Sequence, residues 1–297
     1  MNIKTPIEFN FSECLEFLNR SDNECLHSIE GEKIRKLLKA NKKLLLIEIS
    51  NAGKQRIQIE FLNINPDETV KNLVVEYVKE WFDLSYQMNP FYKMAEKDGV
   101  LNSVVNDYRG LRLIGIPDFF EAITWAIIGQ HINLRLAYSM KRKFVEAFGE
   151  ALRYDGKTYW LFPDAEAIAK ITVDDLMMFQ FTRKKAEYII AIAQSLIDGK
   201  LDSEGFKVIG DYETVKKELM NLKGVGNWTA NYVLMKYFRF PQAFPIEDVG
   251  LHNAIKQRFG WTEKPSIEKI RELAEAWKGY EAYATFYLWR SFVQITL

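Results

Sequence analysis

The chain is poor in several residues that carry chemistry in other classes of protein. Its 297 residues include two cysteines, Cys14 and Cys25. Two thiols can form one disulfide at most, and with no visible secretory signal we expect both to stay reduced. They are also too few to ligate an iron–sulfur cluster. The three histidines, His27, His131 and His252, lack the spacing of metal ligands, so a catalytic zinc is not expected.

The chain also lacks net charge and long apolar runs. Its 40 basic residues are balanced by 40 acidic ones. This balance counts against a protein that coats DNA nonspecifically, because phosphate neutralisation dominates such binding, but it allows an enzyme with a local basic face. No apolar run reaches the ~20 residues of a membrane span. The N-terminus shows no basic segment followed by an apolar one, so we expect a cytoplasmic protein, associated with the nucleoid if bacterial.

Hydrophobic residues make up 48% of the chain and aromatic residues 14%, which is typical of a globular protein with a large core. Residues 1–93 read as a mixed α/β unit. Alternating apolar residues predict a hairpin from strands 44–50 and 55–61, and a helix follows that begins at Asp67 or Glu68. Nothing in this unit indicates chemistry.

From Pro117 onward the pattern is helical. The expected helix starts are Asp118 (with Glu121 as a capping box), Asn133, Thr172, Thr182 and Ser266. Further helices are expected at about 249–259 and 280–293. We divide this part into a helical domain of residues 119–238 and a second helical domain formed by 94–118 and 239–297.

The most informative stretch is Leu222–Tyr232, where a Gly-x-Gly joins two helical patterns. A short glycine hairpin leaves free N–H groups at the positive start of the second helix. The glycines let a phosphate approach the backbone closely, so a DNA phosphate is a suitable ligand. Taken alone, the pattern also fits a simple tight turn. About twenty residues later, Phe244–Leu251 contains Glu247 and Asp248.

Together with Asp248, the hairpin resembles the helix-hairpin-helix DNA glycosylase superfamily, and within it the 3-methyladenine DNA glycosylase II type. The similar segments occur in the family's order over roughly residues 110–290; they are 110–117, 126–130, 183–187, 224–232 and 255–259. The resemblance implies an α+β fold. An N-terminal antiparallel sheet like half of a TATA-binding protein would precede a mainly helical helix-hairpin-helix body.

By resemblance, Asp248 is the catalytic residue. Its position after an extended Phe-Pro-Ile and before a helix also fits an ordinary helix N-cap, and the two roles are compatible. A fixed carboxylate stabilises the positive charge that develops on the sugar and can orient or deprotonate water. Glu247 is the rival residue, expected to face solvent or a basic neighbour. One extra helical turn separates Asp248 from Lys256, compared with the family pattern.

Trp228 stands where relatives that also cut the DNA backbone carry a lysine nucleophile. An indole has no such amine, so the resemblance implies a monofunctional glycosylase without lyase activity. Trp228, Tyr232 and Trp289 match the family's base pocket, although their helical spacing alone fits core packing. Electron-rich rings attract an alkylated, positively charged base that has been flipped out of the duplex.

Further DNA contacts are implied by position. Gln130 and His131 occupy the place of the wedge that fills the gap left by the flipped base, although His131 also fits a polar loop residue. Arg183 and Lys184 begin a helix, where cations are disfavoured, so a DNA phosphate contact and a solvated face fit these residues equally well. Lys141–Lys143 is interpreted as a solvated face. The hairpin residues expected at the DNA backbone are Lys223, Gly224, Val225, Gly226, Asn227 and Thr229.

The sequence therefore predicts a monomeric DNA N-glycosylase of base excision repair that acts on double-stranded DNA. Its substrates would be alkylated purines such as 3-methyladenine and 7-methylguanine, and its product an abasic site. No cofactor is required, although the carbonyls of Met220, Leu222 and Val225 are implied by resemblance as ligands of Na⁺ or K⁺. The alternatives are a glycosylase for oxidised or deaminated bases, a non-catalytic damage-binding module, or a helical scaffold that binds protein.

Overall fold

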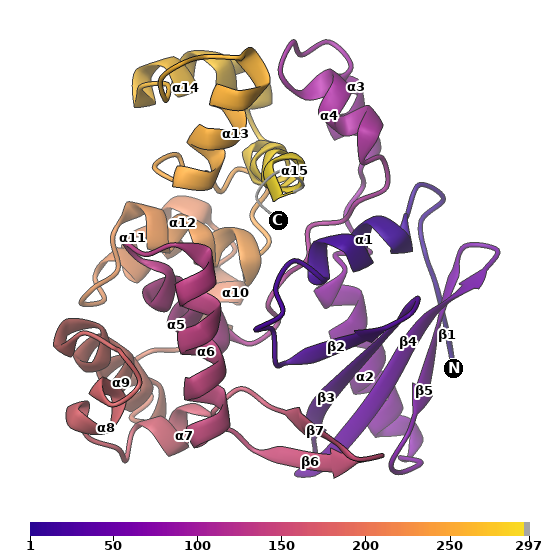
Figure 1. Ribbon diagram of the computed structural model, residues 1–297, viewed down its shortest axis with the longest axis vertical. Coiled ribbons are helices and arrows are strands. Elements are labelled where there is room, and N and C mark those ends of the chain that lie inside the picture. Colours follow the sequence, from indigo (N-terminus) through magenta and orange to yellow (C-terminus); the bar gives the residue numbers. More distant parts are fainter. Residues whose placement is uncertain (294–297) are drawn as a thin grey trace.

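The computed structural model describes residues 1–293 and begins with an antiparallel sheet of five strands in the order β1-β5-β4-β3-β2 (Figure 1). The strands are β1 (Asn2–Lys4), β2 (His27–Glu30), β3 (Lys33–Ala40), β4 (Lys43–Gly53) and β5 (Arg56–Phe61). Lys54 and Gln55 form the β4–β5 turn, and both have positive φ angles (48° and 57°), as a two-residue hairpin requires. The predicted hairpin is confirmed.

Helix α2 (Glu68–Trp81) covers one face of the sheet with Val70, Val74, Val78 and Trp81. Asp67 caps it by accepting the Val70 N–H. The opposite face carries a smaller cluster of Leu37, Leu46 and Tyr159. Tyr159 comes from a separate hairpin of β6 (Ala151–Tyr154) and β7 (Lys157–Trp160), so the helical body reaches back to the sheet (Figure 1).

The other elements described are helical. They are α1 (Phe11–Leu18), α3 (Asn89–Ala95), α4 (Leu101–Asp107), α5 (Phe119–Gly129), α6 (Leu134–Phe148), α7 (Ala165–Ile168), α8 (Val173–Met177), α9 (Arg183–Ile197), α10 (Ser203–Ile209), α11 (Tyr212–Met220), α12 (Asn227–Lys236), α13 (Val249–Phe259), α14 (Ile267–Ala274), the 3-10 helix η1 (Glu275–Trp277) and α15 (Glu281–Val293). In Figure 1, α13–α15 gather at one end, α5, α6 and α10–α12 lie in the middle, and α7–α9 lie at the other end beside the β6–β7 hairpin. Helix α1 lies between the sheet and α15, and Arg290 on α15 pairs with Glu13 on α1 at 3.0 Å.

The predicted N-caps hold where the sequence placed them. Asp118, Asn133, Thr182 and Ser266 each accept an N–H from the first turn of their helix, and Thr172 forms a complete capping box with Asp175. At Asp118 the cap bond from the Glu121 N–H forms, but the predicted capping box with the Glu121 side chain does not. Cys14 and Cys25 are free thiols, as predicted. The strands β1–β3, helix α1, the β6–β7 hairpin and the short helices α3, α4, α7 and α10 were not predicted individually. Within residues 1–293, no helix combines the length and the apolar character needed to cross a membrane.

Candidate active site

The hairpin between α11 and α12 is built around Gly224. Its φ of +87° lies in the left-handed region, and a Cβ atom there would come within 2.1 Å of the Tyr188 ring on α9. Glycine is needed for both reasons. Gly226, the N-cap of α12, has a φ of −93° and no atom within 4 Å of an added Cβ, so it lies open to an approaching ligand. No side chain caps α12, which leaves its first N–H groups available for an anion.

One half-buried side chain, Gln130, and one buried side chain, Lys185, join this hairpin to the end of α5. The Gln130 amide donates to the Gly224 carbonyl at 2.9 Å and to the Thr229 hydroxyl at 2.8 Å. The Lys185 ammonium donates to the Ile128 and Gln130 carbonyls, both at 2.8 Å, and burial lowers its pKa. Lys185 therefore neutralises the C-terminal end of α5 and orients Gln130.

This arrangement bears on two of the predicted DNA contacts. Both N–H groups of the Gln130 amide are committed to the hairpin, so these bonds would have to break for the side chain to enter a duplex, and its wedge role stays a prediction. The Thr229 side chain is buried and accepts from Gln130, so only the Thr229 N–H is left for a phosphate. His131, by contrast, is exposed and has a positive φ of 57° at the turn after α5, so its ring projects from the surface.

The charged residues among the other predicted DNA contacts lie on the surface, whereas Val225 is buried. Lys223 and Lys184 are exposed. Arg183 is exposed and pairs with Asp174 at 3.2 Å. The Asn227 amide donates to Glu247 at 2.7 Å, which places the exposed Glu247 beside the hairpin rather than facing a basic neighbour.

Asp248 is the N-cap of α13 and is also held by two indole groups. Its Oδ1 accepts the Leu251 N–H at 2.8 Å and the Trp289 Nε1–H at 2.7 Å. Its Oδ2 accepts the Trp228 Nε1–H at 3.0 Å. Three donors therefore hold the carboxylate in one orientation. The predicted cap is confirmed, and it leaves a half-buried carboxyl group that faces the hairpin helix.

The three rings of the predicted pocket lie side by side. The Tyr232 ring centroid is 5.6 Å from that of Trp228 and 6.1 Å from that of Trp289, with interplanar angles of 35° and 33°. The Trp125 Nε1–H donates to the Tyr232 hydroxyl at 2.9 Å. Burial raises the pKa of Tyr232, so its hydroxyl stays protonated at neutral pH. The Tyr232 side chain therefore lines two spaces, the Asp248 site on one side and a cavity on the other.

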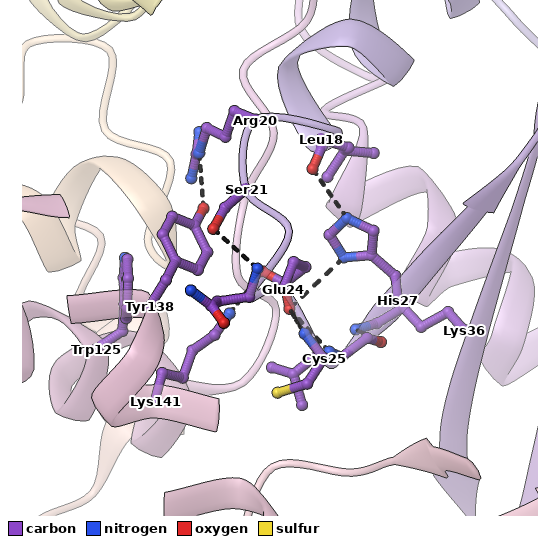
Figure 2. Close-up of polar contacts among 12 residues, drawn as sticks. Leu18, Arg20, Ser21, Glu24, Cys25, His27, Lys36, Trp125, Tyr138 and Lys141 are labelled. Carbon is purple, nitrogen blue, oxygen red and sulfur yellow. Dashed lines mark hydrogen bonds and ion pairs between the residues drawn. The ribbon is translucent and has the colours of Figure 1, made fainter. Parts of the chain in front are cut away.

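A cavity of about 60 Å³ lies behind Tyr232, between the helical body and the N-terminal unit. Its aromatic side is formed by Trp125 on α5 and Tyr138 on α6, whose ring centroids are 4.9 Å apart. Arg20, which follows α1, donates from Nε to the Tyr138 hydroxyl at 2.7 Å and lies 4.0 Å from the Phe17 ring centroid. Figure 2 shows Arg20 and Tyr138 pointing toward one another.

The far side of the cavity is charged. The Lys141 ammonium donates to the Glu24 carboxylate at 2.6 Å, and both side chains are buried (Figure 2). Burial alone would raise the pKa of Glu24, but Lys141 and His27 outweigh it and lower that pKa. Burial lowers the pKa of His27 to about 4, so this ring is neutral at pH 7. Burial raises the pKa of Glu121 to about 7 against the pull of Lys36 and Lys141.

Sequence reasoning missed this cavity. Residues 1–93 were interpreted as free of chemistry, yet Arg20 and Glu24 come from that segment. Lys141 was expected on a solvated face and is instead buried against Glu24 and the Trp125 and Tyr138 rings. Its neighbours Arg142 and Lys143 do reach the surface. An available signal was the helical spacing of Tyr138 and Lys141, which places a cation on the same apolar face as a ring.

A hairpin with free N–H groups, next to a carboxylate fixed between indoles, defines a class of protein. This class is the helix-hairpin-helix DNA glycosylases, and in this chain the indole of Trp228 stands where some members carry a lysine nucleophile. The sequence comparisons agree with the geometry. The chain belongs to the HhH-GPD superfamily of base excision DNA repair proteins, whose pattern matches residues 124–279. It is therefore a base excision repair glycosylase.

Two of the similar proteins cover nearly the whole chain, and a third covers 61% of it. A DNA-3-methyladenine glycosylase of Bacillus subtilis (strain 168) is 42% identical over 97% of this chain and 95% of its own length. DNA-3-methyladenine glycosylase 2 of Escherichia coli (strain K12) is 33% identical over 61% of this chain and 60% of its own. Among solved structures, the 3-methyladenine DNA-glycosylase from Archaeoglobus fulgidus superposes with a TM-score of 0.86, at 25% identity, over 100% of this chain and 99% of that one.

The N-terminal unit is also similar to a known domain. The pattern of the 8-oxoguanine DNA glycosylase N-terminal domain matches residues 3–123. The resemblance found from the sequence covered roughly residues 110–290, so this match extends the similarity to the N-terminal unit. The five-stranded sheet and the helical body that follows it confirm the predicted α+β fold.

Proposed function

We propose that the chain excises alkylated purines, such as 3-methyladenine and 7-methylguanine, from double-stranded DNA by hydrolysis and leaves an abasic site. The observation that carries this proposal is the carboxylate of Asp248, held by Trp228, Trp289 and the Leu251 N–H beside the hairpin. The names of the B. subtilis and A. fulgidus relatives support the substrate class.

In the proposed mechanism, the α12 N-terminus and Lys223 hold a phosphate of the damaged strand, and exposed Lys184 and Arg183 add charge nearby. His131 would fill the space left in the duplex. The flipped base would then stack among Trp228, Tyr232 and Trp289.

The bond between the sugar and the base breaks with its electron pair moving to the base. Asp248 stabilises the positive charge on the sugar and orients the attacking water, whose oxygen bonds to the sugar carbon while one of its protons passes to the Asp248 carboxylate. A base alkylated on a ring nitrogen leaves as a neutral molecule, so the protein need not protonate it. Trp228 offers no amine for a Schiff base, which favours a monofunctional enzyme.

The remaining predictions stay part of this proposal. Since water is the nucleophile, no cofactor is needed. The Met220, Leu222 and Val225 carbonyls suit Na⁺ or K⁺ as hard oxygen ligands, and the Leu222 carbonyl accepts the Val225 N–H at 3.0 Å within the turn. We propose a monomer that acts where the genome lies, which is the cytoplasm in a bacterium. The three-unit division (1–93; 119–238; 94–118 with 239–297) is likewise proposed.

The test is single-turnover release of 3-methyladenine and 7-methylguanine from methylated duplex DNA. Asp248→Asn keeps the shape of the side chain and removes its charge, so release is expected to fall about 10²–10⁴-fold while DNA affinity is kept. Glu247→Gln is the matched control, because that residue is exposed and contacts Asn227 alone among the described residues. Equal release by wild type and Asp248→Asn would refute the role of Asp248. No release by wild type would refute the substrate class.

A further inference from the structure

The cavity behind Tyr232 offers hydrogen-bond donors on the side that faces the active site. The Tyr232 hydroxyl already accepts from Trp125, and the Tyr138 hydroxyl already accepts from Arg20. Neither hydroxyl hydrogen has an acceptor among the described residues. The terminal nitrogens of Arg20, which carry four N–H groups, likewise have no partner there. Guanidinium and phenol hydrogens therefore line this end of the cavity.

The Glu24 carboxylate, the acceptor of the cavity's charged side, is already occupied. Its two oxygens accept from the N–H groups of Cys25 and Leu26 and from Lys141. Tyr232 belongs both to the ring pocket beside Asp248 and to the lining of the cavity. Arg20 and Tyr138 line the cavity together with Tyr232, so their donors lie in the space that adjoins the ring pocket at Tyr232.

A flipped purine has a defined direction in this site. Its N9 atom, which is bonded to the sugar, has to lie near Asp248. The edge opposite N9 carries the substituent on C6 and therefore points past Tyr232. A cavity of about 60 Å³ accommodates one polar edge of a base rather than its whole ring system. Guanine derivatives present a carbonyl oxygen there, and adenine derivatives present an amino group.

We propose that Arg20, with the hydroxyls of Tyr138 and Tyr232, recognises the 6-oxo group of the flipped base. The site would therefore favour 6-oxopurines such as 7-methylguanine over 6-aminopurines such as 3-methyladenine. This inference rests on the proposed function. The 6-amino group of an adenine derivative donates hydrogen bonds, so it would face the N–H and O–H donors of the protein and leave them without an acceptor. The 6-oxo group of a guanine derivative accepts hydrogen bonds from these same donors.

The same contact assists the reaction. When the bond between the sugar and the base breaks, the electron pair enters the purine, and part of its charge is delocalised onto the 6-oxo oxygen. Arg20 is a fixed cation beside that position, held on the Phe17 ring and by Tyr138. A preorganised donor of this kind stabilises the transition state more than the bound substrate.

The experiment uses the full-length chain in excess over duplex DNA methylated to contain both bases. Released 7-methylguanine and 3-methyladenine are separated and quantified from the same reaction. The measured quantity is the ratio of the two release rates, so 3-methyladenine serves as the internal reference for 7-methylguanine. For Arg20→Ala, 7-methylguanine release is expected to fall about 10- to 100-fold, while 3-methyladenine release stays within about threefold of wild type. Arg153→Ala, at an exposed arginine on β6, is the matched control and should match wild type for both bases.

Two further variants separate recognition from structure. Arg20→Lys keeps the charge but loses the planar fork, so an intermediate ratio is expected. Tyr138→Phe keeps the ring, removes one hydroxyl and should shift the ratio in the same direction by a smaller factor. Equal losses of both bases in Arg20→Ala and Arg20→Lys would show that Arg20 only positions the rings, and an unchanged ratio in all variants would also overturn the inference. If wild type releases neither base, the proposed function itself fails.

Discussion

Asp248 and Arg20 lie on opposite sides of Tyr232, and the chain builds these two ends of the site in different ways. The Asp248 end comes from residues within about seventy positions of one another, and hydrogen bonds to one carboxylate and a glycine turn hold it. The cavity end joins Arg20 and Glu24 to Tyr138 and Lys141, more than a hundred positions away, through buried charge.

In our proposal, the Asp248 end cleaves the bond between sugar and base, and the cavity end selects which base is cleaved. In the proposed mechanism, hydrolysis of any purine uses the same carboxylate and the same phosphate contacts, and these residues lie on one compact motif. The identity of the base is read at its far edge, where the N-terminal unit supplies residues. Changes at the cavity end should therefore alter stability or base preference, and changes at the Asp248 end should alter the rate for all bases.

The largest effect on stability is expected from breaking the buried ion pair at the cavity end. Lys141→Met leaves the Glu24 carboxylate buried without its cation, so the free energy of unfolding should fall by about 3–5 kcal/mol in urea denaturation. Lys200→Met removes an exposed cation paired with Asp198 and should change it by less than about 1 kcal/mol. A comparable small loss for Lys141→Met would mean that charge does not hold this end together. The double variant with Glu24→Gln should recover part of the loss.

A smaller loss of unfolding free energy is expected at the hairpin, because a substitution there strains the backbone and does not unpair a buried charge. Gly224→Ala forces a Cβ into the left-handed region and against the Tyr188 ring, which should cost about 2 kcal/mol or more of unfolding free energy. Gly226→Ala meets no atom within 4 Å and has a negative φ, so it is the matched control for stability. Thermal unfolding of the two variants, side by side, tests this difference. Equal melting temperatures would contradict it.

The smallest effect depends on pH. Burial raises the pKa of Glu121 to about 7, above its unfolded value near 4.5, so the folded protein binds the extra proton between these values. The stability contribution is therefore present below about pH 4.5 and is lost as pH rises through 7. Glu121→Gln, which cannot ionise, should be more stable than wild type by on the order of 1–2 kcal/mol at pH 8 and about equal to it at pH 5.

His27 titrates in the opposite sense and has to be separated from Glu121. Its pKa is lowered to about 4, so the unfolded state binds more protons below 6.5 and stability falls as pH drops toward 4. The difference between Glu121→Gln and wild type cancels this contribution, because both proteins keep His27. A stability difference that does not change between pH 5 and pH 8 would refute the assignment to Glu121.

The two ends also differ in how far the sequence predicts them. Asp248, the hairpin glycines and the N-caps were placed correctly, because each depends on residues close together in the chain and on backbone rules that hold locally. The predicted hairpin 44–50 with 55–61 holds for the same reason.

The cavity end could not be predicted, because it is formed by contacts between residues far apart in the chain. Nothing around Arg20 indicates that Tyr138 will accept from it, and a basic run at 141–143 is usually solvated. Gln130 shows the same limit on a smaller scale: its position near the hairpin was expected, but the commitment of its amide to Gly224 and Thr229 depends on how α5 packs against α12. Local sequence predicts the backbone and its caps, whereas tertiary packing decides which polar groups become buried partners.

The bonds from Trp228 and Trp289 to one carboxylate also have an optical consequence. Indole emission responds to the charge and the hydrogen bonding around the ring nitrogen, and two of the seven tryptophans share Asp248 as their acceptor. A base that enters between them would change the surroundings of both rings together. The native chain therefore carries its own fluorescent reporter at the reacting bond, so base entry can be followed in stopped-flow experiments without an added label.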